Sequence, residues 1–143
     1  MQDLLRFTMA EGRRPRVLVI DDDPGVREVV RYLFQDFGYE CETAADGPRG
    51  LARFNEGGWD LVLTDLGMPE MSGWEVVEAI RRQSRTTPIV LITGLIGPEV
   101  IRRSGELGLP VVPKPFRSEV LRAAVARALE ANPSSRGSPS SQG

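Results

Sequence analysis

The sequence contains no histidine, and it has a single cysteine and a single lysine among its 143 residues. Without histidine the chain has no imidazole base, no histidine metal ligand and no phosphohistidine of its own. Because Cys41 has no partner cysteine, no internal disulfide can form, which fits a reducing cytoplasm, and we expect a cytoplasmic location. Lys114 stands among 18 basic residues that are otherwise all arginine. It is either a chance of composition or the mark of a site that needs a compact ammonium group.

Long apolar runs are absent too, since no stretch approaches the roughly 18 residues that span a bilayer. The first residues lack the apolar segment of a secretory signal. The formal net charge is −2 and the isoelectric point is near 5.3, which argues against nucleic acid as the main partner. We therefore expect neither membrane insertion nor direct nucleic-acid binding.

The length and composition indicate one ordinary globular domain. We place this domain at residues 16–131, after an N-terminal extension at residues 1–15. From Asn132 the chain reads NPSSRGSPSSQG, a Ser/Pro/Gly composition that cannot build a core. Residues 132–143 are therefore predicted to be a disordered tail.

Short β-branched runs alternate with segments of helical periodicity. Strands are predicted at 16–20, 40–43, 61–64, 89–92 and 111–112, and helices at 24–37, 48–56, 74–82, 98–107 and 118–130. The first helix is expected to bury Val26, Val29, Val30, Leu33, Phe34 and Phe37, and the last helix Val120, Leu121, Ala124, Val125, Ala128 and Leu129. Five apolar strands that alternate with five helices predict an α/β fold with a doubly wound parallel sheet.

Polar residues follow the predicted strands where each one ends. Asp21 and Asp22 end the first strand, Asp65 the third and Thr93 the fourth, and Lys114 follows the fifth. Ligands of parallel sheets bind beyond the carboxyl ends of the strands. We therefore expect these five side chains to meet at one edge of the sheet.

Carboxylates at such an edge repel one another by about 4 kcal/mol per pair at an effective dielectric constant near 20. A hard divalent cation would offset this repulsion, and Mg²⁺ takes one or two carboxylates while leaving room for phosphate oxygens. Lysine is a common point-charge partner of phosphate. The cluster thus predicts phosphoryl chemistry with one carboxylate as the nucleophile. Asp23 is explained more simply, as the N-cap of the helix that begins at Pro24.

Four segments, in this order, carry a resemblance to a known family: VLVIDDDP (17–24), LVLTDLGMPEMSG (61–73), IVLITG (89–94) and VVPKPF (111–116). From about Arg16 to Leu129 the chain resembles the receiver domains of bacterial two-component response regulators. The resemblance implies a flavodoxin-like fold with strand order 2-1-3-4-5. It fits a free-standing regulator as well as a receiver excised from a hybrid kinase or a larger regulator.

The resemblance also implies a role for each residue at the predicted edge. Asp65 matches the aspartate that accepts the phosphoryl group. Asp22, Asp65 and the carbonyl of Gly67 match the ligands of Mg²⁺, for which Mn²⁺ can substitute, and Asp21 matches an acid that acts through metal-bound water.

Thr93 and Lys114 match the hydroxyl and ammonium groups that contact the phosphoryl group, and the Lys114–Pro115 bond is expected to be cis. By the same resemblance the chain is a phosphoryl-accepting switch in signal transduction, and it catalyses only its own phosphorylation and dephosphorylation. The expected donor is a sensor histidine kinase or a phosphotransfer protein of a phosphorelay, and the downstream effector is unknown. Phosphorylation is expected to change the face formed by the fourth helix, fifth strand and fifth helix, through which a homodimer can also form.

Three features depart from the family pattern. Val111 occupies a position where the family often has a large aromatic side chain, so we expect weaker or differently routed switching. Gly67 replaces a side chain that often borders the phosphoryl site. The segment 94–108 contains four glycines, which predicts a marginally stable fourth helix.

Two alternative functions remain open from the sequence. A phosphatase of the haloacid dehalogenase type also uses an aspartyl nucleophile after a strand, but its Asp-x-Asp-x-Thr/Val pattern is not met where DDDPG ends in Gly25. The second alternative is a receiver that serves only as a docking module.

Overall fold

The computed structural model describes residues 13–131, in which five strands alternate with five helices. The elements are β1 (Arg16–Ile20), α2 (Pro24–Asp36), β2 (Glu40–Ala44), α3 (Gly47–Phe54), β3 (Leu61–Asp65), α4 (Gly73–Gln83), β4 (Ile89–Thr93), α5 (Pro98–Leu107), β5 (Val111–Pro113) and α6 (Ser118–Glu130). The predicted elements are all present, with ends that differ by up to two residues. Most of the predicted extension and all of the predicted tail lie outside the described residues.

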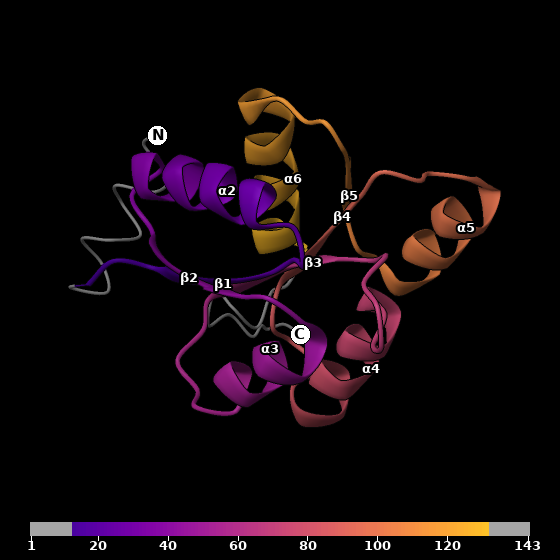
Figure 1. The fold of residues 1–143 in the computed structure, drawn as a ribbon, viewed down its shortest axis with the longest axis horizontal. Coiled ribbons are helices and arrows are strands. Elements are labelled where there is room, and N and C mark those ends of the chain that lie inside the picture. The colour runs from indigo at the N-terminus through magenta and orange to yellow at the C-terminus, as the bar shows by residue number, and fades with distance from the viewer. Residues whose placement is uncertain (1–12, 132–143) are drawn as a thin grey trace.

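The strands form one parallel sheet in the order β2-β1-β3-β4-β5. This confirms the predicted doubly wound fold and its strand order. Figure 1 shows α2 and α6 on one side of the sheet and α3 and α4 on the other, with α5 beside the β4–β5 edge. Within the described part of the chain, no helix is long and apolar enough to cross a membrane.

The sheet has a hydrophobic core on each of its faces. Val17 and Val19 pack with the α2 and α6 side chains, whereas Leu18 and Ile20 pack with those of α3 and α4. Consecutive residues of a strand point to opposite faces, so a strand covered on both sides must be apolar throughout. The unbroken apolar runs of the sequence are therefore explained by the two helical layers.

Two residues predicted to lie in the core are instead exposed. Val29 on α2 is 54% exposed and Val120 on α6 is 41% exposed. A helix buries one stripe of its surface, and the stripe of α2 is centred on Val30 and Phe34, which are fully buried. Val29 lies beside this stripe, one turn before Tyr32, which is 70% exposed.

Gly73, the first residue of α4, allows this helix to approach the end of β3. Its amide donates a hydrogen bond to the Leu66 carbonyl at 3.0 Å. A Cβ atom at this position would lie 2.1 Å from the Asp65 carbonyl oxygen and 2.7 Å from Leu66 Cα. Because both of these atoms belong to the backbone, the chain that carries Asp65 would have to move to make room.

We predict that Gly73→Ala lowers the free energy of unfolding by at least about 2 kcal/mol, because a methyl group there overlaps fixed backbone atoms. Gly105→Ala on α5 is the matched control, since a Cβ there meets nothing within 4 Å. It should raise the free energy of unfolding by about 0.5–1 kcal/mol. Urea unfolding of both variants measures the contrast, and equal changes would contradict the packing described for α4.

Candidate functional site

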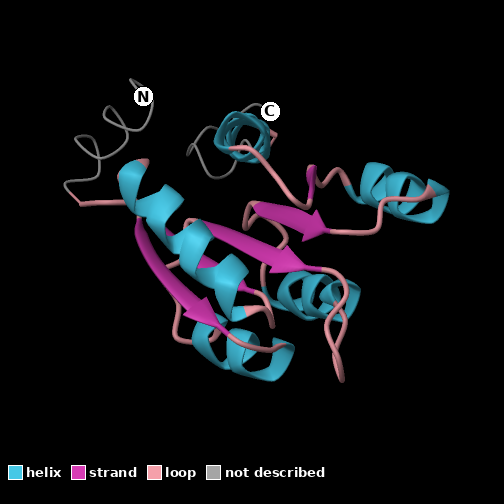
Figure 2. Cartoon of the chain, turned by 45° about the horizontal axis from the view of Figure 1, so that its top comes forward, coloured by secondary structure: helices cyan, strands magenta, loops and turns pink. Residues whose placement is uncertain are grey.

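The polar residues predicted to share an edge of the sheet do so in the structure. Asp65 and Thr93 are the last residues of β3 and β4, and Asp21 and Lys114 directly follow β1 and β5. All strand pairs are parallel, and the arrowheads in Figure 2 point the same way. Four chain segments that are far apart in sequence therefore deliver these side chains to one place.

Lys114 connects two buried carboxylates. Its ammonium nitrogen lies 2.9 Å from Asp21 Oδ2 and 3.3 Å from Asp65 Oδ2. The exposed fractions of Asp21 and Asp65 are 0% and 5%. Burial lowers the pKa of Lys114, but its close contacts with the Asp21 and Asp65 carboxylates outweigh this effect, so the net pKa is raised. The lysine therefore stays charged and partly offsets the repulsion between the carboxylates.

Asp21 is held by its surroundings but is not fully satisfied. Its Oδ1 accepts a hydrogen bond from the Asp23 amide at 2.9 Å, and its carbonyl accepts one from Arg27 Nη1 at 2.8 Å. Oδ2 has the ion-pair contact with Lys114, yet among residues 13–131 no donor approaches it with hydrogen-bond geometry. Burial raises the pKa of Asp21, and the Asp23 amide and Lys114 oppose this change.

The third carboxylate, that of Asp22, is exposed and lies at the mouth of the cluster. Oxygens of Asp21, Asp22 and Asp65 lie within 4.8 Å of one another. Clustered carboxylate oxygens, one of them buried without a hydrogen bond, are the donor set of a hard divalent cation. The residues present therefore fit a magnesium site with an open side toward solvent.

Gly67 and Thr93 border this cluster in different ways. The Gly67 amide donates to Asp65 Oδ1 at 3.3 Å, and a Cβ at Gly67 would meet nothing within 4 Å. The Thr93 hydroxyl is bonded to the backbone of Leu95, from whose amide it accepts at 3.1 Å. In the described part of the chain no hydrogen bond links Thr93 to Asp65. The Lys114–Pro115 bond is cis, as expected.

The hydrogen bond from Arg27 to the Asp21 carbonyl could not be predicted from the sequence. An arginine in the first turns of an amphipathic helix has the pattern of a solvated residue. Its bond to the Asp21 carbonyl depends on how the loop between β1 and α2 folds back, which no spacing rule describes.

Comparison with known proteins agrees with this geometry. Residues 17–126 match the family described as the response regulator receiver domain. The chain belongs to this family. Receiver domains are the phosphoryl-accepting switches of two-component signalling, which disfavours the dehalogenase-type phosphatase.

Curated relatives match part of their own length only. The DNA-binding dual master transcriptional regulator RpaA of Synechocystis is 36% identical over 83 residues, which cover 57% of this chain and 34% of RpaA. The sensor histidine kinase RcsC of Salmonella typhimurium is 33% identical over 111 residues, which cover 77% of this chain and 12% of RcsC. The chain thus spans about a third or less of these relatives.

Two solved structures match this chain over almost their whole length. The chemotaxis protein CheY4 of Vibrio cholerae superposes with a TM-score of 0.75 at 38% identity, covering 80% of this chain and 98% of CheY4. The response regulator TrrA of Thermotoga maritima, solved in complex with Mg²⁺ and BeF, has a TM-score of 0.73 at 35% identity, covering 80% of this chain and 99% of TrrA.

We predict that Asp22→Asn stabilises the metal-free protein by up to about 1 kcal/mol, because it removes one exposed charge from the repelling cluster. The same variant should lose the rise in unfolding midpoint that Mg²⁺ produces in the wild type. Asp36→Asn, at the opposite end of α2, removes an exposed carboxylate but should keep the Mg²⁺ response. Urea unfolding with and without Mg²⁺ tests this, and an Asp22→Asn protein that responds fully to Mg²⁺ would contradict the proposed site.

Proposed function

We propose that Asp65 accepts a phosphoryl group from a phosphohistidine of a partner sensor histidine kinase or phosphotransfer protein. The observation that carries the proposal is the Lys114 ammonium, which contacts Asp65 beside two further carboxylates. Since these 143 residues contain no histidine, the donor imidazole must lie outside this sequence.

The metal ligands are proposed from this cluster together with the pattern of the receiver family. Asp22, Asp65 and the Gly67 carbonyl would hold Mg²⁺ directly, with Mn²⁺ as a substitute, and Asp21 would act through metal-bound water. When bound, the ion supplies positive charge that stabilises the phosphoryl oxygens during transfer.

In the transfer step a carboxylate oxygen of Asp65 attacks phosphorus. A P–O bond forms, the P–N bond of the phosphohistidine breaks, and the imidazole of the donor leaves with the bonding electron pair. Lys114 neutralises charge on the phosphoryl oxygens, and the Thr93 hydroxyl exchanges its Leu95 contact for one of them. Hydrolysis of the acyl phosphate by water returns the Asp65 carboxylate, and Gly67 leaves the approach of that water open.

The change at Thr93 would pass to the face formed by α5, β5 and α6. Val111, at the start of β5, is half-buried and has no ring that can swing between two positions. α5 itself is weakly anchored, because Ser104 is its only buried residue. Arg103 tethers this helix to α4, with its guanidinium 4.6 Å from the Trp74 ring centroid and 3.3 Å from a Glu78 oxygen. We propose that the contact of Arg103 with Trp74 and Glu78 changes when Asp65 is phosphorylated, and that it takes the place of an aromatic residue at position 111.

The setting of the switch is proposed on the same basis. The chain acts in the cytoplasm, catalyses only its own phosphorylation and dephosphorylation, and does not itself bind nucleic acid. The α5–β5–α6 face meets an effector or a second copy of the chain. The domain itself occupies residues 16–131.

Phosphoryl labelling tests the proposed function. With acetyl phosphate and Mg²⁺, the wild type should gain the mass of one phosphoryl group, and Asp65→Ala should gain none. Lys114→Arg should slow labelling by about tenfold or more, because a planar guanidinium cannot take the place of a compact ammonium. Asp23→Asn keeps the helix cap and should label normally. Labelling of Asp65→Ala, or none in the wild type, would refute the assignment.

Fluorescence tests the proposed route to α5. In a Trp59→Phe background, binding of beryllofluoride should change the emission of Trp74. Arg103→Gln should abolish most of this change and speed amide exchange in α5 about three- to tenfold, since it removes a contact worth roughly 1 kcal/mol. Arg102→Gln is the control, because among residues 13–131 Arg102 forms ion pairs only with Glu99 and Glu106 of its own helix. Equal effects of the two substitutions would rule out the Arg103 contact as the route.

A further inference from the structure

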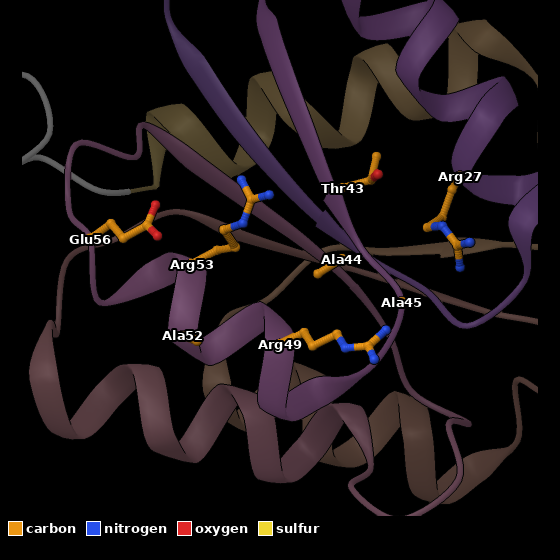
Figure 3. Close-up of a pocket in the computed structure, with 8 residues that line it drawn as sticks. All are labelled: Arg27, Thr43, Ala44, Ala45, Arg49, Ala52, Arg53 and Glu56. Carbon is orange, nitrogen blue, oxygen red and sulfur yellow. The ribbon is translucent and has the colours of Figure 1, made fainter.

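A pocket of about 420 Å³ lies outside the acidic cluster, between α2, the end of β2 and α3. Arg27, Arg49 and Arg53 line its sides, and Ala44, Ala45 and Ala52 contribute small apolar side chains (Figure 3). This volume lies in the range of small-molecule sites. The acceptor Asp65 belongs to β3, which β1 separates from β2, so the pocket is distinct from the phosphoryl site.

The arginines differ in how much of their charge is already paired. Arg53 forms an ion pair with Glu42. The Arg49 side chain is 75% exposed, and its Nε lies 3.7 Å from Asp46 Oδ2. This ion pair is long and solvent largely screens it. Arg27 donates to the Asp21 carbonyl, and in the described chain no carboxylate forms an ion pair with it. Arg27 and Arg49 therefore carry positive charge that is available to a ligand.

A fourth guanidinium adds to the same side. Arg31 lies one turn after Arg27 on α2, and its Nη2 donates to the Thr43 hydroxyl at 3.3 Å. Thr43 itself lines the pocket. The acidic lining residue, Glu56, lies beside Arg53 at the end away from Arg27 in Figure 3. The end of the pocket near Arg27 is thus basic, whereas at the other end the charge of Glu56 offsets that of Arg53. The alanines lie between the two ends.

We propose that this pocket binds a small phosphomonoester, with its phosphoryl oxygens between Arg27 and Arg49 and its organic part over the alanines. Guanidinium groups match phosphate oxygens through paired N–H donors. The alanines leave space for an apolar group that a bare phosphate does not fill. Because Arg27 also holds the Asp21 carbonyl, the ligand would touch the residue that braces the acidic cluster.

Methyl NMR of alanine-labelled protein tests this proposal without divalent cations or a phosphoryl donor, so its outcome is independent of Asp65 phosphorylation. Phenyl phosphate, inorganic phosphate and phenol are titrated at constant ionic strength. Phenyl phosphate should shift the methyl signals of Ala44, Ala45 and Ala52 saturably and bind more tightly than inorganic phosphate. Phenol should cause no saturable shift.

The variants separate this pocket from the acidic cluster and from general surface charge. Arg27→Gln and Arg49→Gln should each weaken the binding of phenyl phosphate about tenfold, because each removes one charge-assisted hydrogen bond to the phosphoryl group. Arg85→Gln, an exposed arginine between α4 and β4, should leave binding unchanged, and so should Lys114→Met. The proposal is overturned by shifts that do not saturate, by equal weakening in Arg49→Gln and Arg85→Gln, or by loss of binding in Lys114→Met.

Discussion

The contact of the Lys114 ammonium with Asp21 and Asp65 is the interaction on which the site depends. Two carboxylates with exposed fractions of 0% and 5% cannot both remain charged in a protein interior without a nearby cation. Lysine supplies one positive charge to two buried negative ones, and exposed Asp22 adds a third. The three carboxylates therefore carry more negative charge than Lys114 offsets, and in the proposed mechanism a divalent ion neutralises the excess before a phosphoryl group approaches.

The fold supplies this arrangement through the direction of its strands. Parallel strands place their carboxyl ends at one edge, so residues from β1, β3, β4 and β5 meet although they are far apart in the chain. The apolar strands and both helical layers hold these ends rigidly. Close packing of α4 at Gly73 against the Asp65 carbonyl also holds the backbone of Asp65 in place. The stability of the sheet thus offsets the cost of concentrating like charges at its edge.

Much of this arrangement can be predicted from the sequence, because apolar runs and strand-end residues follow simple rules. The alternation of elements and the meeting of Asp65 with Lys114 both follow from parallel pairing. The exposure of Val29 and Val120 does not, because periodicity marks a face but not the width of the stripe that packs. The Arg27 contact and the Arg103–Trp74 contact join long flexible side chains across elements, and only the packed structure determines which partner each one meets.

A crystal structure of the protein with Mg²⁺ and beryllofluoride tests the central claim most directly. The account predicts one metal ion bound by Asp22, Asp65 and the Gly67 carbonyl, with the beryllofluoride on an Asp65 oxygen and contacted by Lys114 and Thr93. A metal ion bound elsewhere, or beryllofluoride on any carboxylate other than that of Asp65, would contradict it.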